Sequence, residues 1–139
     1  MSENLIVEIL KKETIIDNYS AFHRISEDVS EWGFDEFVYD LPNKWDLSLC
    51  IWDDAPIAYA MLSRKWTDRI HIHQFMVKKE YRRSGVGGVL MSDLIKRYSK
   101  DPISLKVESN NNGAIRFYNR YGFIFKGVED GNGWMWKQK

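Results

Sequence analysis

The first part of the chain mixes strand-like alternation with one stretch of helical periodicity. Leu5–Leu10 alternates apolar and polar residues and is predicted to be a strand. A helix capped by Thr14 is predicted to run to Ser26, because its apolar residues recur close to the helical period. Residues 27–40 fit either a helix or a loop. Farther along, three strands are predicted between turn-forming residues: Leu47–Trp52, Ile57–Leu62 and Arg69–Val77.

After residue 77 the pattern changes to helices that alternate with strands. Apolar residues from Val86 to Tyr98 form one stripe of an amphipathic helix, and Pro102 follows it. A second amphipathic helix is predicted from Ala114 to Tyr121, stopped by Gly122. The remaining strands are predicted at Ile103–Val107, Phe123–Lys126 and Trp134–Trp136, the last two as a hairpin. This order predicts a single α/β (α+β) domain, residues 1–139, built on a mixed sheet.

Composition narrows the class of protein further. The chain has 139 residues, of which 44% are hydrophobic, enough for one core of its own. Its one cysteine, Cys50, excludes a disulfide framework or a thiolate metal cluster within the chain, and no metal is expected. No apolar run is long enough to span a membrane, and residues 1–12 do not resemble a signal peptide. We therefore expect a cytoplasmic protein that does not bind membranes.

The formal net charge of zero hides a strong asymmetry between the two halves of the chain. Residues 1–60 contain 13 acidic and 4 basic residues, a net charge of −9. Residues 61–139 contain 7 acidic and 16 basic residues, a net charge of +9. Two solvated faces would account for this split, but so would two halves that serve differently charged partners. Nucleic-acid binding is not expected, because the basic residues concentrate around the glycine-rich segment described next.

A glycine-rich segment, Ser84-Gly85-Val86-Gly87-Gly88, lies between a predicted strand and a predicted helix. Glycines at a helix N-terminus let several backbone N–H groups point at one anion, and Arg82 and Arg83 just before them can neutralise phosphate. Two familiar loops are excluded. A dinucleotide fingerprint would need glycine at Leu90, and a P-loop would need a lysine after Gly88.

A second segment follows at a fixed distance, Val107-Glu108-Ser109-Asn110-Asn111-Asn112-Gly113-Ala114, and continues through Tyr118 to Gly122-Phe123. Together the two segments closely resemble the GNAT superfamily of N-acetyltransferases. The first is similar to its motif Arg/Gln-x-x-Gly-x-Gly/Ala. The second is similar to its signature of Val, Asn, Ala, Tyr and Gly-Phe. The detailed match covers about residues 69–127.

The resemblance implies a fold, a donor and a set of binding residues. The fold is a mixed, mostly antiparallel sheet, splayed in the middle, with about four flanking helices. The donor is acetyl coenzyme A. Backbone groups of the splayed strand would pair with its pantetheine arm, at Phe75, Met76 and Val77. Asn111 would contact the pantetheine or the thioester. The pyrophosphate would rest on the amides of the glycine loop, at Arg83, Ser84, Gly85, Val86, Gly87 and Gly88.

Acyl transfer to an amine needs a neutral nucleophile, a donor for the tetrahedral oxyanion and a proton for the departing thiolate. A splayed strand leaves N–H groups unpaired, and the N–H of Phe75 is our candidate for the oxyanion. Tyr118 is the candidate acid, although a tyrosine on an apolar helical stripe could also be a packing residue.

The base is less well defined. His71 occupies the strand position that often carries a glutamate base in the resembled family, and His73 would share its face if the strand is regular. Glu108 and a water relay are the alternatives. Because the ordinary pKa of histidine is about 6.5, a histidine base would make activity rise through neutral pH.

The acceptor is expected to be a small cationic amine, such as an amino sugar or a polyamine. The acidic residues among 27–40 would attract it, and Trp32 and Trp45 could stack on its charge. The acceptor side is therefore placed in about residues 1–60. The alternatives are a protein or peptide N-acetyltransferase and a non-catalytic acyl-CoA-binding module. A monomer or a homodimer would serve either reaction.

Overall fold

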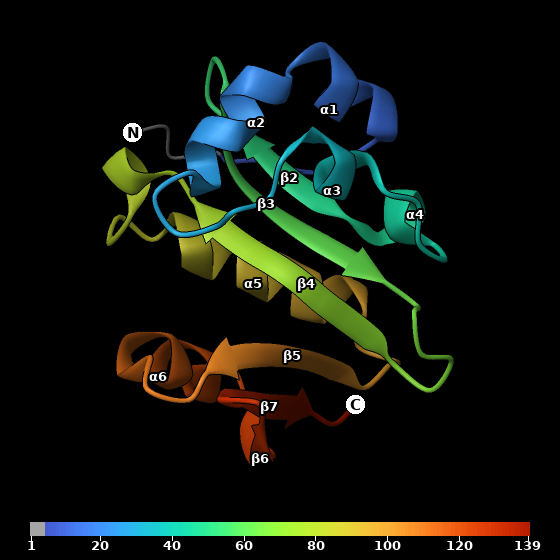
Figure 1. Ribbon diagram of the computed structural model, residues 1–139, viewed down its shortest axis with the longest axis vertical. Coiled ribbons are helices and arrows are strands. Elements are labelled where there is room, and N and C mark those ends of the chain that lie inside the picture. Colours follow the sequence, from blue (N-terminus) through green and yellow to red (C-terminus); the bar gives the residue numbers. More distant parts are fainter. Residues whose placement is uncertain (1–4) are drawn as a thin grey trace.

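Seven strands form one sheet in the computed structural model, which describes residues 5–139 (Figure 1). The strands lie in the order β1-β2-β3-β4-β5-β7-β6. Every neighbouring pair is antiparallel except β4 and β5, which are parallel. Their bounds are β1 Val7–Ile9, β2 Leu49–Trp52, β3 Pro56–Ser63, β4 Ile70–Val77, β5 Ile103–Glu108, β6 Ile124–Glu129 and β7 Asn132–Lys137. The expected mixed, mostly antiparallel sheet is confirmed.

Helices cover the sheet on both faces. In Figure 1, α5 lies behind the sheet, and α2 and α3 lie in front of it. The six α-helices described are α1 Lys12–Asp17, α2 Tyr19–Ser26, α3 Phe34–Val38, α4 Lys44–Leu47, α5 Val86–Arg97 and α6 Asn112–Arg120, with a 3₁₀ turn at Lys79–Tyr81. We expected about four flanking helices; the larger number arises because the N-terminal region forms four short ones.

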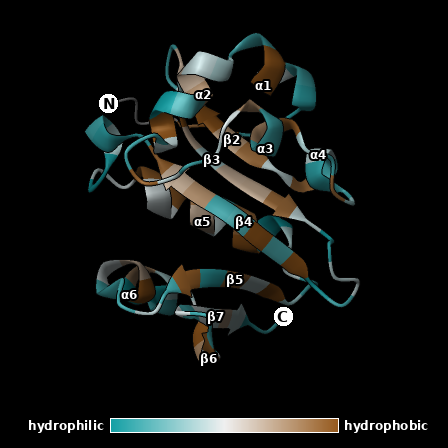
Figure 2. Ribbon diagram, in the orientation of Figure 1, coloured by the Kyte–Doolittle hydropathy of each residue, from teal (hydrophilic) through white to brown (hydrophobic). Residues whose placement is uncertain are grey.

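Two hydrophobic clusters, one on each face, hold these layers together. Alternation along β3 divides its side chains between them, because successive residues of a strand point to opposite faces. Ala58 and Ala60 join the cluster beneath α5, whereas Tyr59 and Met61 join the cluster beneath α1, α2 and α3. Figure 2 shows the apolar residues of the strands running through the middle of the fold. Since both faces are covered, β3 is buried along its whole length.

The parallel pair at the centre of the sheet separates after three residues. β4 and β5 pair at Ile70, His71 and Ile72, whose partners are Ile103, Ser104 and Leu105. Beyond these pairs the two strands diverge, as Figure 1 shows. A register shift against β3 occurs at the same place, because Leu62 pairs with Ile72 and Met61 with Gln74, leaving His73 as the extra residue. The expected splay is thus present, with a β-bulge at its origin.

The N-terminal region differs most from the sequence expectation. The helix expected from Thr14 to Ser26 is broken at Asn18, whose backbone φ of −133° is not helical and whose side chain donates to the carbonyl of Thr14. The segment 27–40, left open between helix and loop, contains both: a loop and then the short helix α3. Within the described residues 5–139, no helix is long and apolar enough to cross a bilayer.

Candidate active site

The glycine loop ends in the first turn of α5, as expected. Gly85 precedes the helix with a φ of +89°, a left-handed conformation that glycine adopts without strain. Its carbonyl accepts the N–H of Val89 at 3.0 Å. The N–H groups of Val86, Gly87 and Gly88 precede that first helical bond and have no carbonyl to pair with inside the helix. Three donors at the positive end of a 12-residue helix can therefore hold an anion.

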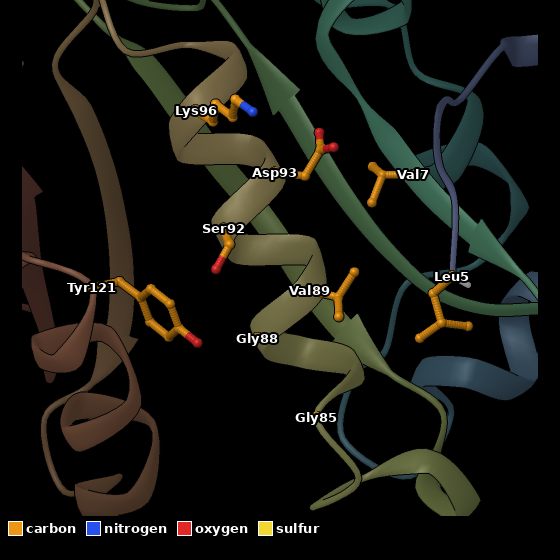
Figure 3. Close-up of a pocket in the computed structure, with 9 residues that line it drawn as sticks. All are labelled: Leu5, Val7, Gly85, Gly88, Val89, Ser92, Asp93, Lys96 and Tyr121. Atoms are coloured by element: carbon orange, nitrogen blue, oxygen red, sulfur yellow. The ribbon is translucent and has the colours of Figure 1, made fainter. Parts of the chain in front are cut away.

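Glycine also keeps the neighbourhood of this turn open. A Cβ on Gly88 would lie 2.8 Å from the hydroxyl oxygen of Tyr121, too close without a shift. A Cβ on Gly87 would lie 3.6 Å from both Phe117 and Val77, so this residue lies between α6 and β4. A groove of about 570 Å³ runs from the same turn along α5 to Lys96 (Figure 3). The glycine turn thus lies between the groove along α5 and the space that opens between β4 and β5.

Arg82 does not point freely at this anion site. Its guanidinium donates to both carboxylate oxygens of Asp28, at 2.8 and 3.0 Å, and its Nε donates to the carbonyl of Val77. The hydrogen bond from Arg82 lowers the pKa of Asp28 below its usual value. Arg82 is therefore engaged within the protein, and its role in neutralising phosphate stays a prediction. The hydroxyl of Ser84 likewise bonds to the carbonyl of Tyr81.

Unpaired backbone groups line β4 beyond the splay. The N–H of Lys78 donates to the carbonyl of Ile57, which makes that pair a hydrogen-bonded one of the β3–β4 ladder. Hydrogen-bonded and non-bonded pairs alternate in an antiparallel ladder. Phe75 and Val77 thus turn their backbone groups away from β3, toward the side where β5 has diverged. The N–H of Phe75 is open, as expected for an oxyanion donor.

Met76 does not share that property. It occupies a bonded pair with Tyr59 by the same alternation, and its side chain packs on the cluster beneath α1, α2 and α3. The strand therefore offers the N–H and carbonyl of Phe75 and the N–H of Val77 to a ligand, because the carbonyl of Val77 already accepts the Nε–H of Arg82. Met76 is not among the residues with free backbone groups.

Tyr118 lies next to Phe75, across the splay. The centroids of the two rings are 6.3 Å apart, and Phe123 packs on the other side of Tyr118 at 5.8 Å. Burial raises the pKa of Tyr118 to about 12, so its hydroxyl keeps its proton at neutral pH. Among residues 5–139 no hydrogen bond to this hydroxyl is present. The structure thus brings the expected acid and the expected oxyanion donor together.

Two other expected site residues have different surroundings. Asn111 precedes α6, and its side-chain oxygen accepts the N–H of Ala114 at 3.1 Å, so this residue caps the helix. Glu108 is exposed at the end of β5, opposite Asn132 of β7. Both lie at the β5–α6 connection, on the far side of the splay from β4.

The two candidate base histidines line a pocket of about 290 Å³ at the origin of the splay. We call it the histidine pocket; its charged and aromatic walls are Trp32, Lys65, Trp66, His71, His73 and Lys106. The imidazole centroids are 4.8 Å apart, so the rings share one face despite the bulge.

Neither histidine titrates near neutral pH. Burial lowers the pKa of His71 to about 3 and that of His73 to about 4, and neighbouring cations lower both further. These low pKa values argue against the expectation that a histidine base makes activity rise through neutral pH. Both rings are neutral at pH 7 and bind protons too weakly to take one from an ammonium group.

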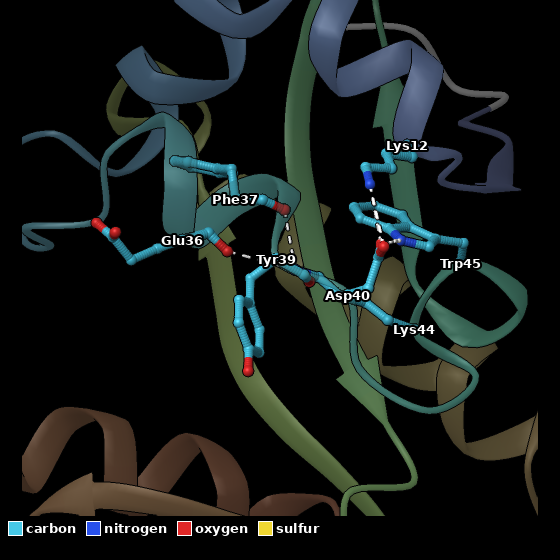
Figure 4. A network of polar contacts seen from close by, with 7 residues as sticks. All are labelled: Lys12, Glu36, Phe37, Tyr39, Asp40, Lys44 and Trp45. Carbon is cyan, nitrogen blue, oxygen red and sulfur yellow. Dashed lines mark hydrogen bonds and ion pairs between the residues drawn. The ribbon is translucent and has the colours of Figure 1, made fainter.

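The acidic segment is largely occupied by contacts within the protein (Figure 4). Asp40 pairs with the ammonium of Lys12 at 3.1 Å and accepts the indole N–H of Trp45 at 2.8 Å. Glu36 accepts the N–H of Gly33 at the start of α3. The buried ammonium of Lys44 donates to the carbonyls of Phe37 and Tyr39, and lies 4.8 Å from the centroid of the Trp45 ring. The cation next to this tryptophan is therefore the protein's own.

Several pocket residues were missed from the sequence. Lys65 and Trp66 lie in the β3–β4 connection, and Lys106 lies on β5 beside the splay. The position of Lys106 in the pocket depends on which strand pairs with β4. That strand, β5, begins 26 residues after β4 ends. The one available signal was the alternation Ser104, Lys106, Glu108, which puts these polar side chains on one face of β5.

Comparisons with known proteins agree with this geometry. Residues 11–123 match the family described as "Acetyltransferase (GNAT) family". A curated relative, the probable spermine N(1)-acetyltransferase of Bacillus subtilis subsp. natto, is 38% identical over 74 residues, 50% of this chain and 45% of that protein. The chain spans about half the length of the curated relatives that it matches.

Solved structures share the fold over nearly the whole chain. The ribosomal-protein-S18-alanine N-acetyltransferase from Escherichia coli superposes with a TM-score of 0.77 and 19% identity, covering 97% of this chain and 94% of that one. The PaiA N-acetyltransferase from Thermoplasma acidophilum, solved in complex with coenzyme A, gives a TM-score of 0.68 and 15% identity, covering 98% and 99%.

Proposed function

The chain belongs to the GNAT family of acetyltransferases, and we propose that it transfers an acetyl group from acetyl coenzyme A to the primary amine of a small acceptor. One observation carries the proposal: unpaired backbone groups of β4 lie between the glycine turn of α5 and the hydroxyl-bearing ring of Tyr118. Such an arrangement offers hydrogen-bond donors to the pyrophosphate end and to the thioester end of an extended coenzyme A thioester. It also places a proton donor beside the thioester.

The residues present fit the donor substrate. The N–H groups of Val86, Gly87 and Gly88 would hold its pyrophosphate, and Arg83 remains beside them as a charged group. The carbonyl of Phe75 and the N–H of Val77 would pair with the amides of its pantetheine arm, in the place that a neighbouring strand would otherwise take. The neighbour solved with coenzyme A supports the same donor. The side-chain oxygen of Asn111 caps α6. Its side-chain N–H₂ group is not used by that bond and would contact the thioester end.

The chemistry follows from three groups. The neutral amine attacks the thioester carbon, forming the C–N bond, while the carbonyl oxygen gains negative charge next to the N–H of Phe75. Collapse of this intermediate breaks the C–S bond and restores the carbonyl. The leaving thiolate takes the proton of Tyr118, and the N-protonated amide gives its surplus proton to water. The phenolate of Tyr118 then takes a proton back from water, which restores the acid.

Water is the proposed base because the other candidates fit less well. His71 lies four residues before Phe75, a rise of about 13 Å along β4, and the rings of His71 and His73 are engaged by Ser104 and Ser63. The N-protonated amide left after C–S cleavage is acidic enough to give its proton to water, so no stronger base is needed. Glu108 would need to act across the splay. Its replacement by glutamine is expected to leave turnover nearly unchanged.

The acceptor is proposed to be a small molecule. The acceptor side and the cofactor core are proposed to lie in one domain. A polyamine is supported by the name of the relative from Bacillus subtilis subsp. natto, but that match covers 50% of this chain. The acidic residues expected to attract a cation are mostly paired internally. Protein acceptors are supported only by neighbours of similar fold.

Thiol release in the presence of acetyl coenzyme A and a panel of amines tests the proposal. Tyr118→Phe should lower turnover by ~10²–10⁴-fold while coenzyme A binding changes little, because only the hydroxyl is lost. Tyr98→Phe is the matched control, since the hydroxyl of Tyr98 bonds to the carbonyl of Leu47 away from the splay. Thiol release from no amine, with coenzyme A still bound, would instead indicate the non-catalytic binding module.

A further inference from the structure

The histidine pocket contains two serine–histidine pairs whose hydrogen-bond directions are fixed by a third group. The hydroxyl oxygen of Ser104 lies 2.8 Å from Nδ1 of His71 and also accepts the Nε–H of Arg69 at 2.8 Å. Arginine can only donate, and Ser104 is completely buried. The serine proton therefore needs an acceptor, and among the described residues Nδ1 of His71 is the one in contact. Since Nδ1 accepts, the neutral ring carries its proton on Nε2.

In the second pair, a serine hydroxyl contacts Nε2 of the histidine instead of Nδ1. The hydroxyl oxygen of Ser63 accepts the backbone N–H of Lys65 at 3.1 Å and lies 2.6 Å from Nε2 of His73. Ser63 is completely buried, so its proton goes to Nε2 of His73. The neutral ring of His73 therefore carries its proton on Nδ1. Each histidine keeps one N–H that no other residue in the described part of the chain accepts.

The charges around these donors are positive. Lys65 and Lys106 line the pocket, and Arg69 is held behind it between the rings of Trp66 and Trp136, 4.3 and 4.4 Å from their centroids. Two of these cations are paired with carboxylates outside the pocket: Arg69 with Asp68, and Lys106 with the exposed Glu129 at 3.5 Å. Among residues 5–139, no carboxylate lines the pocket itself. An ammonium group would meet N–H donors and cations here, whereas an oxyanion would meet partners of opposite charge.

We propose that the histidine pocket binds a carboxylate of the acceptor, so that the substrate is a small aminocarboxylate of the amino-acid class. Its reacting amine is several bonds away from the carboxylate, because His71 lies about 13 Å along β4 from Phe75. His71 and His73 donate their free N–H groups to the carboxylate oxygens, Lys65 and Lys106 supply opposite charge, and Trp32 and Trp66 enclose the rest of the molecule. The volume of 290 Å³ equals that of about ten water molecules, enough for such a ligand. His71 is then a positioning residue and not a base. This proposal rests on the acetyl transfer proposed above.

Matched acceptors test the charge requirement. Thiol release is measured with lysine and ω-amino acids, whose terminal amine lies several bonds from the carboxylate, with their amides and with spermidine. The free acids should react with a kcat/KM at least about tenfold above the amides, because a charged hydrogen-bonded contact is lost. Lys65→Gln and Lys106→Gln should each raise the KM for the amino acid by a similar factor and leave the KM for acetyl coenzyme A unchanged. Lys100→Gln, on the exposed turn after α5, is the control.

The histidine donors have their own variants. His71→Gln retains a side-chain N–H and should keep most of the acceptor affinity, whereas His71→Phe should raise the acceptor KM with a smaller effect on kcat. Long-range ¹H–¹⁵N spectra of the histidine rings should show the Nε2–H tautomer for His71 and the Nδ1–H tautomer for His73. Adding an amino acid should shift both signals.

The outcomes separate the two proposals. Turnover that is fastest with spermidine, or equal for acids and amides, would overturn the carboxylate site while leaving acetyl transfer intact. Turnover with no amine would contradict acetyl transfer, and the ring spectra would still decide the pocket. Unshifted ring signals at saturating amino acid would overturn the carboxylate site.

Discussion

At the scale of single residues, the proton positions on two histidines change the interpretation of the site. The sequence placed His71 and His73 on one face of a strand, and both do line one pocket. Their role depends on Ser104 and Ser63, which come from β5 and from the end of β3. The first contact requires the β4–β5 pairing and the second involves the bulged residue, and neither feature has a local sequence signal. Tyr118 was easier to place, because its motif and its helical stripe agree.

The buried histidines also predict how stability depends on pH. Their pKa values are about 3 and 4 in the folded chain and about 6.5 when unfolded. Below pH 6.5 the unfolded chain binds protons that the folded chain does not, so the free energy of unfolding falls as the pH drops from about 6.5 toward 4. At pH 5 each histidine should cost about 2 kcal/mol.

Urea unfolding between about pH 5 and pH 8 measures this effect. Replacing His71 with glutamine should remove about half of the loss, and the double variant with His73→Asn should remove most of it. An unchanged dependence on pH in the double variant would show that other groups cause it.

At the scale of elements, the sequence predicted the order of strands and helices because the alternation typical of strands and the periodicity typical of helices occur in separate segments. The stripe from Val86 to Tyr98 became α5, and the Asp130-Gly131 turn joins β6 to β7 with positive φ angles at both residues. The break at Asn18 was missed, since the apolar residues keep a helical period across it. The free side of β4 was expected from the family resemblance, and only the register distinguishes Phe75 and Val77 from Met76.

The glycine turn gives a prediction for α5. Gly87→Val would put methyl groups between Phe117, Val77 and the first-turn N–H groups, because a Cβ alone is already 3.6 Å from both side chains. Calorimetric titration should show coenzyme A affinity reduced by at least about tenfold, with the far-ultraviolet circular dichroism retained. Gly113→Val, on the exposed first turn of α6, is the matched control for a valine near a helix start. A folded Gly87→Val variant that binds coenzyme A normally would exclude this turn from the pyrophosphate site.

At the scale of the whole molecule, the charge asymmetry acquires a different meaning from the one the sequence favoured. The negative half was expected to serve the acceptor. In the fold, however, Asp28 of that half is paired with Arg82 of the positive half, and Asp40 with Lys12. Among the described residues 5–60, only Trp32 lines the histidine pocket; its other charged and aromatic wall residues come from beyond residue 60. The positive half thus borders both proposed substrate sites.

This arrangement predicts that salt weakens both substrates in the same direction. Coenzyme A phosphates and an acceptor carboxylate are each attracted by the positive half, and raising NaCl from about 50 to about 500 mM shortens the range of that attraction to a few ångströms. The KM for acetyl coenzyme A and the KM for the amino acid should both rise several-fold, while kcat changes little. The KM for an uncharged amino-acid amide, measured with its amine largely deprotonated, is the control and should rise less. Neutralising Glu31 and Asp35, exposed acids of the negative half, should leave both constants unchanged. An acceptor KM that rises when these two acids are neutralised would restore the acidic segment as the acceptor's electrostatic guide.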